Sequence, residues 1–271
     1  MITIDGISYG LSAEDLADRK AYINASEAPT ICSGDPQKRH RLWLQKTGQT
    51  EPEDLSDNIL VQFGSYTEAF NVHWLERKTG LVVEGRQKVY KRDHLRCTLD
   101  GWTTFRDAPC VVEAKFMSPF AKKDDRIQWY MPQVFTQMHL TGARQALLSV
   151  LSGAPDHDWI HVEWDEAYWT QVEAQLADFH ACVSFNQPPH DAPAIAAPSV
   201  SAFKPYDFTG NNEWASHAAD FTATEAAAKT HEAAKKAIKA MVPEDASEVT
   251  GHGIAAKRSK AGAINIKGIA A

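Results

Sequence analysis

The chain has 271 residues, of which 44% are hydrophobic and 23% are charged. This composition is that of one large globular domain, or one domain with an extension, and it excludes wholesale disorder. No apolar run approaches the roughly 18–20 residues of a membrane span, and the N-terminal segment lacks the regions of a secretory signal. The formal net charge of −7 excludes a globally basic surface, so any nucleic-acid binding must be concentrated in a local basic cleft.

Cysteine usage indicates the compartment. The four cysteines, Cys32, Cys97, Cys110 and Cys182, are far apart and form no Cys-x-x-Cys pair. This pattern argues against a disulfide scaffold, an iron–sulfur site or a zinc ribbon, and is typical of reduced thiols. We therefore expect a cytoplasmic protein without membrane contact.

Helical patterns dominate the first 80 residues. Ser12 is a candidate N-cap for a short helix over 11–22, with Asp15 three residues later. A turn at 33–37 precedes a helix over 39–46. A further helix is expected over 66–78, with Gly80 placed where a C-terminal cap belongs.

A strand-rich block follows. Short β-prone runs predict strands over 81–90, 95–99, 110–116, 146–151 and 159–164. Helices are expected between the third and fourth of these strands, over 127–140, and after the last, over 166–185. This order predicts an α/β fold with one central mixed sheet flanked by helices.

The composition changes after residue 186. Residues 187–205 contain five prolines, which is typical of a linker, and residues 213–240 predict an Ala/Lys/Glu-rich helix that is exposed or lightly packed. From residue 251 onward the chain has four basic residues and no acid, as in a DNA-contacting segment or a frayed tail. We place the domain boundary at residue 190, with a Pro-rich linker and a helical or flexible extension over 191–271.

Asp100 and the segment Glu113-Ala114-Lys115 carry the clearest chemical signal. Glu113 and Lys115 leave the same face of their strand, and Asp100 can join them across the turn. Two carboxylates and the Ala114 carbonyl are hard oxygen ligands that suit Mg²⁺ or Mn²⁺, and a lysine beside such a metal can position or help deprotonate a water. The alternative is a solvated strand edge with a Glu–Lys pair. The two valines before Glu113 favour a core strand, where such charges are costly unless they are paired or metal-bound.

Five motifs follow one another along the chain. They are the Arg-x6-Ser segment from Arg19 to Ser26, the G-x-x-x-E helix start from Gly64 to Glu68, the segment from Arg96 to Asp100-Gly101, the E-x-K signature Glu113-Ala114-Lys115, and the Y-x-x-Q segment from Tyr130 to Gln133. In this order, over about residues 15–185, they resemble the phage lambda exonuclease and YqaJ-type viral recombinase family of the PD-(D/E)XK nuclease superfamily. The resemblance implies a PD-(D/E)XK core in which Asp100, Glu113 and the Ala114 carbonyl hold Mg²⁺, with Mn²⁺ as a substitute. It also implies that Lys115 serves the attacking water, that Glu68 and Gln133 lie beside the metal site, and that Arg19 and Ser26 receive the 5′-phosphate of a DNA end.

Four of these residues have plainer alternatives. These are a surface ion pair of Arg19 with Asp15 or Asp18, a helix N-cap at Ser26, a first-turn carboxylate favoured by the helix dipole at Glu68, and an ordinary polar helix-face position for Gln133. The sequence leaves these alternatives open.

The function implied by the resemblance is that of a Mg²⁺-dependent 5′→3′ exonuclease, which degrades one strand of linear double-stranded DNA. The single strand that remains would pass to a single-strand annealing protein in phage-type recombination, in the cytoplasm of a bacterial host. The family also implies a homotrimer around DNA, but residues 199–271 align with no part of the lambda-type enzyme. The alternatives are a structure- or sequence-specific endonuclease and a catalytically silent DNA-end-binding protein, and the intact Asp/Glu/Lys set argues against the silent protein.

Overall fold

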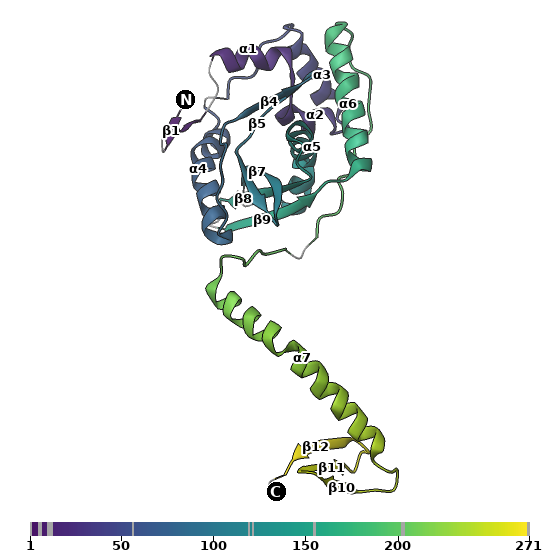
Figure 1. The fold of residues 1–271 in the computed structure, drawn as a ribbon. Coiled ribbons are helices and arrows are strands. Elements are labelled where there is room, and N and C mark those ends of the chain that lie inside the picture. Colours follow the sequence, from purple (N-terminus) through teal and green to yellow (C-terminus); the bar gives the residue numbers. More distant parts are fainter. Residues whose placement is uncertain are drawn as a thin grey trace. The chain divides into compact units, whose positions relative to one another are not determined.

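The computed structural model describes residues 2–4, 7–9, 13–55, 57–118, 120, 122–153, 156–201 and 204–269. The chain divides into two compact units, Met1–Asp207 and Phe208–Ala271, and Figure 1 labels most of their helices and strands. The division falls later than residue 190 because the Pro-rich segment packs on the first unit. The Ile195 amide donates to the Cys32 carbonyl at 3.3 Å, and Ile195, Ala197 and Val200 lie against the core.

Helices precede the main sheet in the first unit. They are α1 (Ala13–Ala21), the 3₁₀ turn η1 (Ala25–Glu27), α2 (Ala28–Ile31), α3 (Pro36–Lys46) and α4 (Ile59–Thr79). Helix α3 begins where the Asp35 carboxylate accepts bonds from the amides of Gln37 and Lys38. Helix α4 begins earlier than predicted because Asn58 caps it, and it ends at Gly80, whose φ of 74° suits glycine. The expected cap Ser12 lies outside the described residues.

The strands form separate sheets. A hairpin pairs β1 (Ile2–Ile4) with β2 (Ile7–Tyr9), and a second sheet has the order β3 (Ile23–Asn24), β5 (Leu95–Thr98), β4 (Val89–Arg92). The main sheet has the order β6 (Gly101–Phe105), β7 (Ala108–Met117), β8 (Gln145–Ser152), β9 (Asp156–Glu163). Strands β7 and β8 are parallel and the other pairs of this sheet are antiparallel, so the main sheet is mixed.

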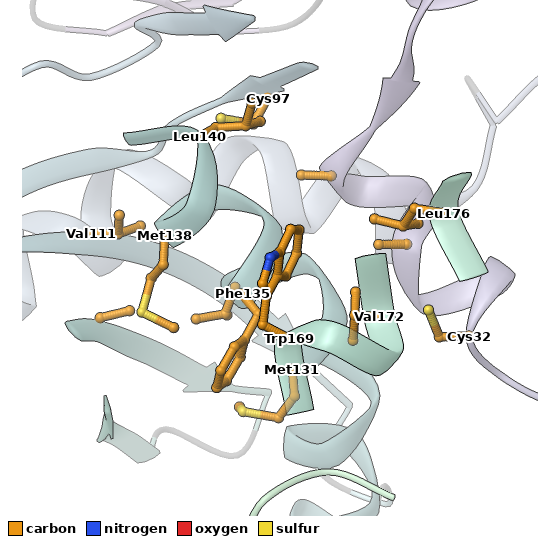
Figure 2. Packing of buried hydrophobic residues seen from close by; sticks show 14 of the residues in the cluster. Cys32, Cys97, Val111, Met131, Phe135, Met138, Leu140, Trp169, Val172 and Leu176 are labelled. Carbon is orange, nitrogen blue, oxygen red and sulfur yellow. The ribbon is translucent and has the colours of Figure 1, made fainter. Parts of the chain in front are cut away.

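The two faces of the main sheet are covered by different helices. Helix α5 (Lys123–Thr141) packs on the face that carries Val111, and helix α6 (Glu166–Ser184) packs against α5 in the same core. Figure 2 shows Phe135 of α5 beside Trp169 of α6. Helix α4 packs on the opposite face, where Val72 and Leu75 lie with Val112. The alternation of side chains along β7 produces this division. The predicted α/β fold, a mixed sheet flanked by helices, is confirmed.

Two strand predictions need correction. The predicted strand over 81–90 is a loop for most of its length, with an isolated bridge from Glu84 to Trp102, and a regular strand begins only at Val89. Strand β6 was not predicted. Strand β6 forms because Gly101–Phe105 pair in antiparallel fashion with β7. Residues 81–88 stay a loop because Glu76 of α4 binds the Val83 amide and Arg86, and their backbone meets β6 at the Glu84–Trp102 bridge, with hydrogen bonds of 2.7 and 2.8 Å.

The second unit consists of a helix and a small sheet. Helix α7 (Asn212–Met241) matches the prediction, and none of its residues is buried. Strands β10 (Glu248–Gly251), β11 (Ile254–Arg258) and β12 (Ile264–Gly268) form an antiparallel sheet, so the basic C-terminal segment is not a frayed tail. Within the described parts of both units, no helix is long and apolar enough to span a membrane.

Candidate active site

Glu113 is the buried centre of a cluster of polar side chains. It lies in the middle of β7, on the face toward α5, and its side chain is 1% exposed. The amides of Gln133 and Gln137 donate to its two carboxylate oxygens, each at 2.5 Å. The Lys115 Nζ atom lies 2.5 Å from Glu113 Oε1. This burial excludes the solvated-edge alternative for the Glu–Lys pair and the plain helix-face alternative for Gln133.

Lys115 carries a positive charge at neutral pH. Burial disfavours its ammonium, but the neighbouring carboxylates of Glu113 and Asp100 outweigh burial and raise the pKa of Lys115. The ammonium also lies over the ring of Tyr130, 5.1 Å from its centroid. Lys115 is therefore held between Glu113 and Tyr130 as a fixed cation.

Asp100 joins this cluster from the turn between β5 and β6. The Ala114 amide donates to Asp100 Oδ2 at 2.8 Å, which ties the turn to the middle of β7. Burial, and then the charges of Glu113 and Glu68, raise the pKa of Asp100 well above its ordinary value. The structure thus brings Asp100, Glu113 and Lys115 together, as the sequence predicted.

Glu68 reaches the cluster from α4. Burial, and then the charge of Glu113, raise the pKa of Glu68 to about 7, and the Gln87 amide donates to Glu68 Oε1 at 2.7 Å. Because α4 begins at Ile59, Glu68 is not in its first turn, which excludes the helix-dipole alternative. For the same reason Gly64 lies inside the helix, so the expectation of a helix start at Gly64 is wrong.

The donor set is compatible with a hard divalent cation. Asp100 and Glu113 offer carboxylate oxygens and Ala114 a carbonyl, while the single ammonium of Lys115 stands against three carboxylates that include Glu68. The raised pKa values of Glu68 and Asp100 reflect burial and this unbalanced negative charge, which a cation would relieve. In the part of the chain that the structure describes, no three His, Cys, Asp or Glu side chains form a ligand group by themselves.

Arg19 and Ser26 also come together. Arg19 Nη2 donates to Ser26 Oγ at 3.1 Å, and Ser26 is exposed. The segment that joins them, which includes β3, is held by Lys46, whose Nζ atom donates to the carbonyls of Arg19 and Tyr22 at 2.5 and 2.6 Å. The pair is therefore preorganised and open to a ligand.

The contacts of Asp18 and Asn24 bear on the two plainer alternatives, an ion pair for Arg19 and a helix N-cap for Ser26. Asp18 contacts Lys91 and Arg96, while the side chain of Asp15 lies outside the described residues. The N-cap of η1 is Asn24, whose main-chain amide donates to the Glu27 carboxylate at 2.9 Å. The N-cap alternative for Ser26 is therefore wrong.

A single strand connects this pair to the carboxylate cluster. Strand β3 pairs in parallel with β5, with Asn24 opposite Arg96, and Asp100 follows Arg96 by four residues. Because Asp100 lies two residues beyond the end of β5, this spacing is at most about 13 Å. Strand β5 therefore links the segment between Arg19 and Ser26 to the turn that carries Asp100.

The model of the YqaJ-like viral recombinase domain matches residues 16–144, a range that contains every candidate residue above. This part of the chain is a YqaJ-like viral recombinase domain. The family resemblance that the sequence motifs indicated is confirmed. A search of curated proteins found no match.

Solved structures share the fold of the YqaJ-like domain. The alkaline exonuclease LHK-Exo from Laribacter hongkongensis is 17% identical, with a TM-score of 0.53 over 65% of this chain and 94% of that chain. LHK-Exo in complex with dAMP is 18% identical with a TM-score of 0.52 and the same coverage. A phage-related exonuclease from Haemophilus somnus 129PT is 10% identical, with a TM-score of 0.50 over 61% of this chain and 94% of that chain. At these identities the likeness shows the fold.

Besides Gln87, two further residues of the YqaJ-like domain that contact this cluster were not predicted. Gln137 follows Gln133 by four residues, a spacing that places both amides on one face of α5 and could have identified it. Asn71 follows Glu68 on α4, and its amide donates to the carbonyls of Lys115 and Ser149, each at 3.1 Å. Asn71 therefore connects α4 to β7 directly behind Lys115.

The raised pKa of Glu68 predicts a pH-dependent stability. The metal-free folded protein binds a proton at Glu68 that the unfolded chain releases near pH 4.5, so stability falls as the pH rises from about 4.5 to about 7. The melting temperature in EDTA should therefore be lower at pH 8 than at pH 5. Glu68→Gln should reduce this difference, and the exposed control Glu53→Gln should not. An equal difference in wild type and Glu68→Gln would contradict the assignment.

Proposed function

We propose that this protein is a metal-dependent deoxyribonuclease of the PD-(D/E)XK type, which degrades one strand of linear double-stranded DNA from its end in the 5′→3′ direction. The observation that carries the proposal is the meeting of Glu68, Asp100, Glu113 and Lys115 within a YqaJ-like domain. The exonuclease names of the solved structures that share its fold support the same reaction class.

We assign Mg²⁺ to the carboxylates of Asp100 and Glu113 and to the Ala114 carbonyl, with Mn²⁺ as a substitute. When bound, this ion would supply Lewis acidity to the water and the scissile phosphate. The Lys115 ammonium holds the attacking water and offsets negative charge that builds up on the phosphate. Gln133 and Gln137 fix the Glu113 carboxylate through their hydrogen bonds. We assign to Glu68, whose pKa is about 7, the ordering of water beside the cation site.

The 5′-phosphate of the DNA end is assigned to Arg19 and Ser26. A guanidinium and a hydroxyl are suitable donors for a terminal phosphate, and their preorganised contact lowers the cost of binding it. Anchoring the phosphate there determines which bond of the strand reaches Asp100 and Glu113. The direction of digestion follows from this anchor.

The remaining parts of the proposal rest on the family resemblance. The single-stranded product would pass to a single-strand annealing protein in phage-type recombination in a bacterial host. The proposed assembly is a homotrimer that encloses the DNA.

Linear and covalently closed circular duplex DNA, incubated with the full chain and Mg²⁺, separate the three candidate functions. An exonuclease digests only the linear form, which is the expected result. A structure- or sequence-specific endonuclease cuts circles, and a silent end-binding protein leaves both forms intact. Either of these two results would refute the exonuclease proposal.

Arg19→Ala should remove the preference for a 5′-phosphate. A charge-assisted contact of Arg19 with a phosphate contributes about 1.5–3 kcal/mol, so wild type should cleave 5′-phosphorylated ends about one to two orders of magnitude faster than 5′-hydroxyl ends. The variant should digest 5′-hydroxyl DNA at nearly the wild-type rate. The exposed neighbour Lys20, changed to Ala, is the control. Equal slowing of both substrates by Arg19→Ala would show that Arg19 is a general DNA contact. A wild-type protein without any preference for a 5′-phosphate would refute the assignment of the phosphate to Arg19 and Ser26.

A further inference from the structure

Gln87 adopts a backbone conformation that its residue type disfavours. It lies in the loop between α4 and β4 with a φ of 61°. The Lys88 amide donates to the Gly85 carbonyl at 3.2 Å, which makes Gln87 the third residue of a turn. Glycine or asparagine is favoured at such a position when φ is positive. A glutamine persists there only where surrounding contacts hold the turn.

The loop is held on both sides. Glu76 of α4 accepts a bond from the Val83 amide at 2.8 Å and pairs with Arg86 at 3.1 Å. On the other side, the Gln87 amide donates to the Leu99 carbonyl at 2.8 Å. These contacts fix the turn whatever side chain stands at position 87, so the turn itself does not require a glutamine.

The side chain of Gln87 joins two parts of the candidate active site. Its main chain is bonded to Leu99, the residue before Asp100, and its side-chain amide donates to the Glu68 carboxylate at 2.7 Å. Gln87 therefore spans from the turn that carries Asp100 to the helix that carries Glu68. A glycine would relieve the backbone but would lose this link.

We propose that Gln87 is a positioning residue, whose amide orients the Glu68 carboxylate toward the cation site formed with Asp100 and Glu113. This inference rests on the proposed nuclease function and deepens it. In this role Gln87 acts through its hydrogen bond to Glu68.

Two variants of the full chain separate orientation from backbone strain. Gln87→Met keeps the backbone strain and the side-chain length but removes the amide donor. Gln87→Gly removes the backbone strain and the amide donor together. Each should lower kcat at saturating linear DNA at least tenfold, with KM for DNA within twofold of wild type. Each should also weaken Mn²⁺ binding, measured by calorimetry without DNA, by about fivefold or more. Gln87→Gly alone should melt at or above the wild-type temperature in EDTA, because only glycine relieves the positive φ.

The exposed neighbour Lys88, changed to Ala, is the matched control and should leave kcat and Mn²⁺ affinity unchanged. Wild-type kcat and Mn²⁺ affinity in both Gln87 variants, in an assay where wild type digests DNA, would overturn the role of Gln87 alone. A loss in Gln87→Met that is absent from Gln87→Gly would trace the effect to the methionine side chain rather than to the missing amide donor, and it would also overturn the role of Gln87. A wild type that neither digests DNA nor binds Mn²⁺ would overturn the proposed function and the role of Gln87 with it.

Discussion

Lys115→Ala should abolish DNA cleavage while leaving DNA binding nearly intact. The Lys115 ammonium lies 2.5 Å from Glu113 and over the Tyr130 ring, inside the carboxylate cluster, where it is placed to hold an attacking water. Removing one preorganised electrostatic or proton-transfer group of this kind typically costs a factor of about 10²–10⁴ in rate. Cleavage of linear duplex and binding to the same duplex in Ca²⁺ would be measured side by side.

Loss of Lys115 also leaves the buried Glu113 carboxylate without its ion-pair partner, which lowers stability. Lys115→Met, which fills most of the volume, and a melting curve for each variant separate unfolding from loss of chemistry. The exposed Lys122, changed to Ala, controls for the loss of one positive charge. Activity of folded Lys115→Ala within a few fold of wild type would contradict the catalytic assignment.

Asp100→Asn should weaken Mg²⁺ binding at least tenfold and leave the stability of the metal-free protein unchanged or higher. The amide retains an oxygen that can accept the 2.8 Å bond from the Ala114 amide, so the turn stays tied to β7. The substitution also removes a negative charge that is disfavoured by burial and by the nearby charges of Glu113 and Glu68, as the raised pKa of Asp100 indicates. Calorimetric titration with Mg²⁺ and melting curves in EDTA measure the two effects.

The exposed Asp107, changed to Asn, serves as the charge-matched control for Asp100. Its Mg²⁺ affinity and melting temperature should equal those of wild type. An unchanged Mg²⁺ affinity in Asp100→Asn would exclude Asp100 as a ligand. A large loss of stability in EDTA would show that its carboxylate supports the fold instead.

Local spacing predicted most of the candidate site. Glu113 and Lys115 share a strand face because side chains alternate, and Gln133 lies on a helix whose apolar positions pack on that face. The contacts of Glu68 were less predictable, because its place in α4 depends on the Asn58 cap, well before the glycine that resembles a helix start. Gln87 carries no local signal. Its role depends on Leu99 and Glu68, which are distant in sequence.

The mispredicted segments share one physical cause. Residues 81–88 have the composition of a strand, but contacts of Glu76 with Val83 and Arg86 hold them as a loop. The Pro-rich segment resembles a free linker, yet the apolar side chains of Ile195 and Val200 bury themselves on the first unit. Tertiary contacts determine the conformation of both segments, and such contacts cannot be predicted from local propensity.

The most direct test of the proposed function is the digestion of linear duplex DNA that carries a label at either the 5′ or the 3′ end of one strand, with Mg²⁺ and a 5′-phosphate. We expect the 5′ label to be released first, as a mononucleotide, while the 3′ label stays in long fragments until late in the reaction. We also expect EDTA to stop the release of both labels. Early release of the 3′ label, or internal cuts without mononucleotides, would contradict the proposed function.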